Sequence, residues 1–230
     1  MTFSGFPKDF FTFFSDLAEN NDRAWFTDHK QRYEESVVAP CLDFISAMAP
    51  ELKKISPHFN AIPKKTGGSM FRIYRDTRFS NDKSPYKTNA GLHFRHARAR
   101  DAHAPGFYLH LEPGRVFYGG GLWRPPTPAL TQIRTAIDDN RAAWQKLKSA
   151  AAFRRQFGEL GDGDPLKRPP KGFTPDHPLI DDLKKRSFFA VAEDTQSAAQ
   201  KPAFVKDVAS AYRSAGPFVE FLCKAVGAPF

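Results

Sequence analysis

The chain is poor in cysteine and has no long hydrophobic run. Only two of its 230 residues are cysteines, Cys41 and Cys223, and both lie in apolar stretches with helical periodicity. This usage predicts buried thiols in a reducing compartment, not a disulfide framework. No apolar run approaches the roughly 20 residues that a membrane-spanning helix needs, and the first residues lack the basic start and apolar core of a signal peptide. We therefore expect a cytoplasmic protein with no membrane partner.

The motifs that identify common enzyme and cofactor classes are missing as well. The chain has no P-loop, no glycine fingerprint of a dinucleotide site and no nucleophile elbow around a serine. Asp82 is followed directly by Lys83, so the spacing typical of many nucleases is not met. Several histidines lie near one another in the sequence, but none has the spacing of a zinc site: His93, His96, His103 and His110. These absences leave the cofactor unknown and enzymatic activity undecided, and they predict no metal site.

The composition is that of an ordinary folded globular protein with an excess of aromatic residues. Hydrophobic residues make up 41% of the chain and charged residues 26%. Aromatic side chains are abundant, with 23 Phe, 6 Tyr and 3 Trp. The length predicts a single domain over 1–230, large enough to bury a core without disulfides or metals.

The positive charge is concentrated in one segment. Of the 34 Lys and Arg residues, ten lie in residues 64–100, against two carboxylates there, which gives a local charge of 10 − 2 = +8. The rest of the chain carries 24 basic and 23 acidic residues, or +1. Concentrated charge attracts anions to one surface. The segment therefore predicts an anion-binding or nucleic-acid-binding region.

Hydrophobic periodicity divides the chain into three parts. Residues of about 7–55 have helical spacing, with Pro40 expected to end or kink a helix. The part from about 69 to 124 alternates with period two, which predicts strands at Ser69–Phe79, Ala90–Arg95 and in a hairpin of Gly106–Glu112 with Arg115–Tyr118.

The last part, about 127–226, returns to helical spacing. We expect helices over 127–157, a short helix at His177–Arg186 capped by Asp176, a strand at Phe188–Ala192, and a helix at Ala203–Val226 interrupted at Gly216-Pro217. Helices, then strands, then helices with one late strand predict an α+β domain with a mainly antiparallel sheet flanked by N- and C-terminal helices.

The densest cluster of chemistry-bearing residues runs from Arg72 to Lys87. If Ser69–Phe79 is a strand, alternate residues share one face, and Arg75 points to the opposite, apolar face. A guanidinium among apolar side chains has to be paired or bound, because an unpaired buried charge is costly. The block therefore predicts either a pocket for a phosphorylated or carboxylated ligand or an ion-pair network built on Asp76 and Asp82.

Two further features lie in the predicted strands. The glycines Gly119–Gly121 allow either a backbone nest for an anion or a bulged strand end. In the predicted strand Gly106–Glu112, the side chains of Tyr108, His110 and Glu112 share a face, an arrangement that suits general acid–base chemistry.

The chain resembles the family named domain of unknown function 2461. The resemblance is carried by ordered matches along nearly the whole chain: 17–26 with Tyr33, 72–89, 106–109, 119–123, Ile133-Arg134, 170–173, His177-Pro178 and Leu183-Lys184. The stretch 96–103 matches nothing in the family pattern. The resemblance implies a single domain and supports the Arg72–Lys87 block as the site. It implies no reaction, since the family occurs in bacteria and fungi without an established activity.

The leading hypothesis is a protein that binds a small anionic ligand, with phosphate as the favoured anion, and that either only binds it or also acts on it. The residues expected to hold the anion are Arg72, Arg75, Arg78, Lys83 and Lys87, with Asp76 and Asp82 to orient them or serve as base. Those expected to stack on or approach the ligand are Tyr74, Tyr86, Trp123 and Gly120. One alternative is a non-catalytic nucleic-acid-binding module that also uses Arg95, Arg98 and Arg100. The other is an interaction protein in which the charges are purely structural. The oligomeric state is unknown.

Overall fold

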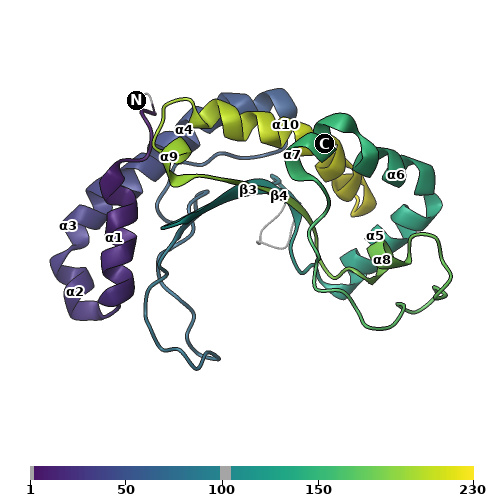
Figure 1. Cartoon of the computed structure of the whole chain (residues 1–230), viewed down its shortest axis with the longest axis horizontal. Coiled ribbons are helices and arrows are strands. Elements are labelled where there is room, and N and C mark those ends of the chain that lie inside the picture. The colour runs from purple at the N-terminus through teal and green to yellow at the C-terminus, as the bar shows by residue number, and fades with distance from the viewer. Residues whose placement is uncertain (1–2, 99–104) are drawn as a thin grey trace.

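The computed structural model describes residues 3–98 and 105–230. Its centre is a four-stranded antiparallel sheet in the order β1-β2-β3-β4. The strands are β1 (Ala90–Arg95), β2 (Gly106–Glu112), β3 (Arg115–Leu122) and β4 (Phe188–Asp194). Figure 1 shows an arch in which the sheet lies beneath helices α4 and α10, with further helices descending at both ends. The predicted α+β fold is confirmed.

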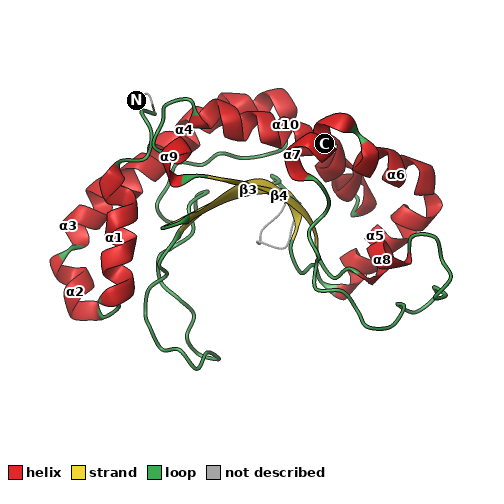
Figure 2. Ribbon diagram, in the orientation of Figure 1, coloured by secondary structure: helices red, strands yellow, loops and turns green. Residues whose placement is uncertain are grey.

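The N-terminal helices form one end of the arch (Figure 2). They are α1 (Lys8–Glu19), α2 (Arg23–Asp28), α3 (Lys30–Tyr33), the π-helical turn η1 (Glu34–Val38) and α4 (Ala39–Ile55). Asp22 begins α2, since its carboxylate accepts hydrogen bonds from the backbone amides of Ala24 and Trp25 at 2.8 and 2.9 Å. Pro40 does not end the helical path. It falls in the first turn of α4, directly after η1, where the missing amide costs little.

The C-terminal helices cover the sheet and form the other end of the arch. They are α5 (Thr127–Asp139), α6 (Arg141–Ser149), α7 (Ala151–Phe157), α8 (Ile180–Lys184), α9 (Gln196–Ala199) and α10 (Phe204–Ala225). The expected interruption at Gly216-Pro217 is wrong, because α10 runs through both residues. Burial of its apolar face between the sheet and α4 offsets the helix-breaking tendency of the proline.

The expected cap at Asp176 is also wrong. Helix α8 starts later, at Ile180, and the side chain of Asp176 hydrogen-bonds to Thr174 instead. His177 holds the start of the helix, since its Nδ1 accepts from the backbone amide of Leu179 at 3.1 Å.

The sheet has one covered and one open face. Successive side chains of a strand point to opposite faces. The covered face packs against α10 and carries fully buried apolar residues, among them Phe94, Phe107, Leu109 and Phe188. The open face lines the hollow of the arch (Figure 1). No helix within residues 3–98 and 105–230 is long and apolar enough to cross a membrane.

The predicted strand at Ser69–Phe79 is wrong. Its first residues run beside the outer edge of β1, where the amide of Phe71 donates to the carbonyl of Gly91 at 2.9 Å and the amide of His93 donates to that of Ser69 at 2.7 Å. Beyond them the chain leaves the sheet, and Phe79 is 95% exposed. The alternation of apolar and charged residues imitated a strand, but the segment has no neighbouring strand to pair with over its length.

Candidate functional site

Strand register gathers the polar residues of the open face. His93 on β1 lies opposite Tyr108 on β2, which lies opposite Gly119 on β3. In the next row, His110 on β2 lies opposite Phe117 on β3. Residues that are distant in the sequence therefore form one continuous surface.

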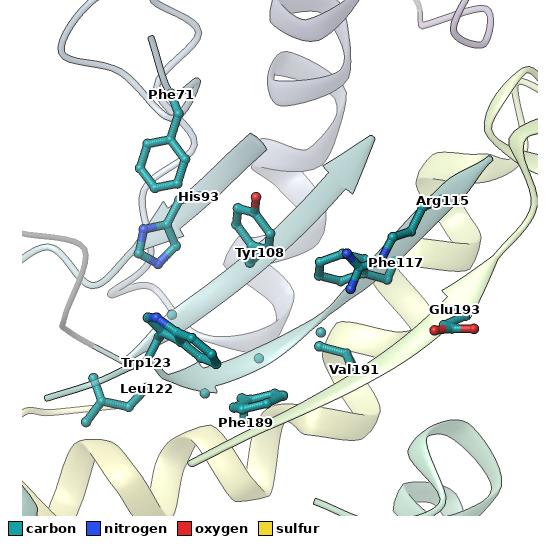
Figure 3. A pocket seen from close by; sticks show the side chains of 14 residues that line it. Phe71, His93, Tyr108, Arg115, Phe117, Leu122, Trp123, Phe189, Val191 and Glu193 are labelled. Atoms are coloured by element: carbon teal, nitrogen blue, oxygen red, sulfur yellow. The ribbon is translucent and has the colours of Figure 1, made fainter. Parts of the chain in front are cut away.

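A cavity of about 500 Å³ lies on this face. Figure 3 shows side chains from all four strands and from the flanking segments pointing into it. Its aromatic walls are Phe71, Tyr108, Phe117, Trp123 and Phe189, and its other lining side chains are His93, Arg115, Leu122, Val191 and Glu193. Clefts that are mostly apolar with a few polar groups are typical ligand sites.

The glycine triplet forms the floor of this cavity. Gly119–Gly121 lie inside β3 and pair with β2 on one side and β4 on the other, so they form neither a nest nor a bulged strand end. A Cβ at Gly119 would lie 1.9 Å from the carbonyl oxygen of Ala190, and one at Gly120 would lie 2.8 Å from a methyl of Val219 on α10. The glycines thus let β4 and α10 approach β3 closely and leave the open face hollow.

His93 is a buried histidine in the cavity wall. The residue is only 8% exposed, and the Nδ1 of its ring has no hydrogen-bond partner among the described residues. Burial, together with the charge of Arg95, lowers the pKa of His93 to about 4. The imidazole is therefore neutral at pH 7.

A second histidine forms a hydrogen-bonded chain. The Nε2 of His110 lies 3.1 Å from Oε2 of Glu112, and its Nδ1 lies 3.2 Å from the hydroxyl of Tyr108. Asn89 Nδ2 is 3.5 Å from the same Nδ1. The face shared by Tyr108, His110 and Glu112 was predicted from the sequence, and the structure shows that the three side chains also touch.

The Arg72–Lys87 block pairs largely with itself. Arg75 forms an ion pair with Asp82, and Arg78 forms one with Asp76 at 2.7 Å. These contacts hold the pKa of Asp76 at about 2, chiefly through its hydrogen bonds with Arg78, and that of Asp82 well below its usual value, chiefly through Ser84 and then Arg75.

Lys83 is also held within the block, since its ammonium donates to the carbonyl of Thr77 at 3.0 Å. Arg75 was expected on an apolar face. It lies instead beside Asp82 because the segment is not a strand.

Arg72 and Lys87 differ from the rest of the block. Neither forms an ion pair within the described residues. The ammonium of Lys87 donates to the carbonyl of Arg72 at 2.8 Å and lies 5.6 Å from the ring centre of Phe71, an aromatic wall of the cavity. Burial, and then the charge of Arg72, lowers the pKa of Lys87. Lys87, which has no carboxylate partner among the described residues, therefore lies next to an aromatic wall of the cavity. Arg72 is exposed, and its charge contributes to the lowered pKa of Asp76.

Lys87 also lines a second, more polar cavity of about 390 Å³, together with Asn21, Arg75, Asp82, Ser84, Tyr86 and Asn89. Asn89 reaches the open-face cavity only indirectly, because its side chain contacts His110, which is hydrogen-bonded to the cavity-lining Tyr108.

The remaining predicted residues are dispersed. Tyr86 is buried and stacks on Phe26 with ring centres 4.1 Å apart, whereas Tyr74 is 54% exposed. Trp123 lines the open-face cavity and the backbone of Gly120 forms part of its floor. Arg95 lies at the end of β1, Arg98 follows the strand, and Arg100 lies outside the described residues, as does His103.

His96 points away from the open-face cavity, with its Nε2 2.9 Å from the carbonyl of Pro229. His93, His96 and His110 are thus held by three different environments.

Four residues that line the cavity were not predicted from the sequence as site residues: His93, Arg115, Phe117 and Phe189. For the first three a signal was present, since each lies on the same face of a predicted strand as another polar or aromatic residue, whereas Phe189 shares its face of the predicted strand only with Val191. This pattern did not identify the cavity, because the sequence does not show which face of the sheet the helices cover.

The comparisons with known proteins agree with the resemblance found in the sequence. Neither a curated protein nor a solved structure matches the chain significantly. The model of one family matches residues 9–221, nearly the whole chain, and its description is conserved hypothetical protein. The chain therefore belongs to the DUF2461 family of conserved hypothetical proteins.

Proposed function

We propose that this protein binds a small ligand that combines a flat ring with an anionic group. The ring occupies the open-face cavity, and the anion, with phosphate as the favoured group, lies at Arg72 and Lys87. The observation that carries the proposal is the position of Lys87, a partly desolvated cation without a carboxylate, beside the aromatic wall of a cavity.

The ring part of the proposal rests on the cavity walls. Aromatic side chains bind flat rings by offset stacking and edge contacts. Trp123 and Phe189 lie on one side of the cavity, with their ring centres 5.3 Å apart, and Phe71 lies on the other (Figure 3). The volume of about 500 Å³ is that of a typical small-molecule site.

The anion part rests on charge. Arg72 and Lys87 repel each other, and this repulsion contributes to the lowered pKa of Lys87. A phosphate or carboxylate between them would remove the repulsion and supply charge-assisted hydrogen bonds. Arg75 and Arg78 are already neutralised by Asp82 and Asp76, so they support the shape of the loop in this proposal.

The test is a thermal-shift screen followed by calorimetric titration. The probes are nucleoside monophosphates, aromatic carboxylates, sugar phosphates, inorganic phosphate and a short oligonucleotide. We expect ring-bearing anions to raise the melting temperature most, inorganic phosphate little, and Lys87→Gln to weaken their binding at least tenfold. The matched control is Lys206→Gln on the exposed face of α10, which leaves binding unchanged.

Three outcomes oppose the proposal. Equal binding by wild type and Lys87→Gln excludes the anion position, and the absence of any stabilising probe excludes the function. Binding of the oligonucleotide alone, falling steeply with salt, supports the nucleic-acid-binding alternative instead. The proposal also places the protein in the cytoplasm, where the buried thiols of Cys41 and Cys223 stay reduced.

A further inference from the structure

The chain Tyr108–His110–Glu112 has the order of a proton relay. All three residues are on β2, and their alternation puts them on the open face, two residues apart. Glu112 accepts a hydrogen bond from Nε2–H of His110, which leaves Nδ1 without a proton in the neutral imidazole. The hydroxyl of Tyr108 therefore donates to Nδ1, and the amide of Asn89 is placed to donate to it as well.

The surroundings hold this arrangement in place. The ring of His110 stacks on Phe117 with ring centres 4.5 Å apart and an angle of 12°. Gly91 makes room for the hydroxyl of Tyr108, since a Cβ at that position would lie 2.6 Å from it. Burial raises the pKa of Tyr108 to about 12, so its hydroxyl keeps its proton at neutral pH.

Of the three hydrogen-bonded residues Tyr108, His110 and Glu112, only Tyr108 also lines the open-face cavity. Its hydroxyl donates to His110, so an oxygen lone pair is free to accept a proton from a bound molecule. A proton accepted there can pass onward, because the original hydroxyl proton moves to Nδ1 of His110 and the resulting imidazolium is stabilised by Glu112.

We propose that Tyr108, His110 and Glu112 form a general acid–base site that removes and returns a proton on carbon in a ring-bearing 2-oxo acid. This inference rests on the proposed function, because the ring and the acid group are held as described above. Protons on oxygen and nitrogen exchange with water unaided, so a positioned relay accelerates chiefly the transfer of a proton bound to carbon. Tyr108 is the catalytic residue, and His110 and Glu112 act through it.

The proton transfer can be written with the substrate and these side chains alone. The C–H bond next to the carbonyl breaks as a proton reaches Tyr108 Oη, and the former hydroxyl proton forms a bond to His110 Nδ1. The electron pair of the C–H bond moves to the carbonyl oxygen, giving an enolate close to the cations Arg72 and Lys87. Reversal returns a proton to carbon.

The test uses phenylpyruvate, which carries a ring, a carboxylate and an enolisable C–H group. In D₂O, loss of its benzylic proton signal measures exchange, and calorimetric titration measures binding. We expect the wild type to accelerate exchange at least about 100-fold over the protein-free rate, since positioned acid–base groups typically contribute 10²–10⁴-fold. Tyr108→Phe should lose this acceleration while it still binds phenylpyruvate.

A pH profile distinguishes a positioning role from a structural one. The groups facing His110 are Tyr108 and Glu112 from β2, Arg115 from β3, and Asn89 from the segment before β1. Exchange should rise with pH as His110 loses its proton, with a midpoint below the ordinary histidine value because burial lowers its pKa. Glu112→Gln should shift the midpoint lower still, because Glu112 raises that pKa. The control Glu159→Gln, on an exposed carboxylate, changes neither the rate nor the midpoint.

The outcomes separate this inference from the proposed function. Binding of phenylpyruvate without accelerated exchange, or full exchange by Tyr108→Phe, overturns the acid–base site and leaves the binding function standing. No binding of phenylpyruvate overturns the substrate class. If the ring-bearing phosphates and carboxylates of the screen also fail to bind, the proposed function fails with it.

Discussion

The two faces of the sheet are built from alternate residues of the same four strands, yet they differ in almost every physical property. The covered face has Phe107, Leu109 and Leu111 on β2, all without exposed surface, and packs against α10. The open face has Tyr108, His110 and Glu112 on that strand, which are linked by hydrogen bonds. One strand thus supplies core residues and chemistry-bearing residues in strict alternation.

Apolar packing and polar hydrogen bonding are therefore divided between the two faces of the sheet. Fully buried apolar side chains each contribute about 1.5–3 kcal/mol to folding. On the open face, buried polar groups and an open cavity reduce that contribution, and they are retained at a cost in stability. Substitutions on the covered face should therefore lower the free energy of unfolding more, and substitutions on the open face should change its pH dependence or ligand binding more.

Truncation of a side chain on the covered face should reduce stability most. Phe107→Ala should lower the free energy of unfolding by about 3–5 kcal/mol, because the ring is fully buried and contacts Tyr212 and Phe59 with ring centres 4.8 and 5.0 Å away. Phe117→Ala, its counterpart on the open face, should cost only about 1–2 kcal/mol, because its ring already borders a cavity. Urea denaturation measures both. Equal losses would show that the open face belongs to the structural core.

The largest contribution of a single histidine to acid sensitivity should come from His93 on the open face. His93 has a folded pKa of about 4, below its usual value of 6.5, so the folded protein binds fewer protons than the unfolded chain between these values. Stability is therefore present above pH 6.5 and falls as the pH drops toward 4, by up to ~3 kcal/mol from this group. His110 shifts in the same direction.

The check is the pH dependence of the unfolding free energy between pH 7 and 4.5. His93→Phe should flatten the curve. A wild-type slope retained in His93→Phe would assign the acid sensitivity to other groups.

The close approach of α10 to the covered face gives a smaller effect. Gly120→Ala should cost about 1–3 kcal/mol, because its Cβ would lie 2.8 Å from Val219 and 3.0 Å from Phe107. Gly216→Ala, within α10 itself, is the matched control. Its Cβ would meet only a methyl of Ile55 at 3.6 Å, so the change should stabilise by about 0.5–1 kcal/mol through helix propensity. Thermal unfolding of both variants measures the difference.

The smallest effect on stability should accompany a large effect on binding. Trp123 is 52% exposed, so Trp123→Ala should change the unfolding free energy by about 0.5 kcal/mol or less. Loss of the ring should nevertheless weaken the binding of ring-bearing anions at least tenfold, measured by calorimetric titration. Unchanged binding would place the ring elsewhere on the open face.

The strands that pair with neighbours over their whole length were predictable from the sequence. Ala90–Arg95 was predicted with its bounds, and so was the hairpin strand Gly106–Glu112. The prediction of a strand at Ser69–Phe79 was wrong, because alternation of apolar and polar residues indicates only that one side of a segment is buried. It says nothing about a partner strand, and here the segment turns away after a few residues.

The candidate site was predictable in part. The contact of Tyr108, His110 and Glu112 follows from strand periodicity once β2 is identified. The cavity does not, because it depends on which face α10 covers and on Phe71 and Phe189, which are 118 positions apart in the sequence. The local positive charge predicted Arg75 and Arg78 as anion-binding residues. In the structure each of them forms an ion pair with a nearby carboxylate.

The backbone contacts along β1 have a consequence for solubility and assembly. An outer strand with unpaired amides and carbonyls invites addition of a strand from another molecule. Here the edge is occupied by the protein's own chain, through Ser69 and Phe71 near the middle of β1 and through the amide of Asn60, which donates to the carbonyl of Arg95 at 3.0 Å. Intermolecular strand pairing at this edge would first have to displace these segments, so the β1 edge is protected from the addition of a strand from another molecule.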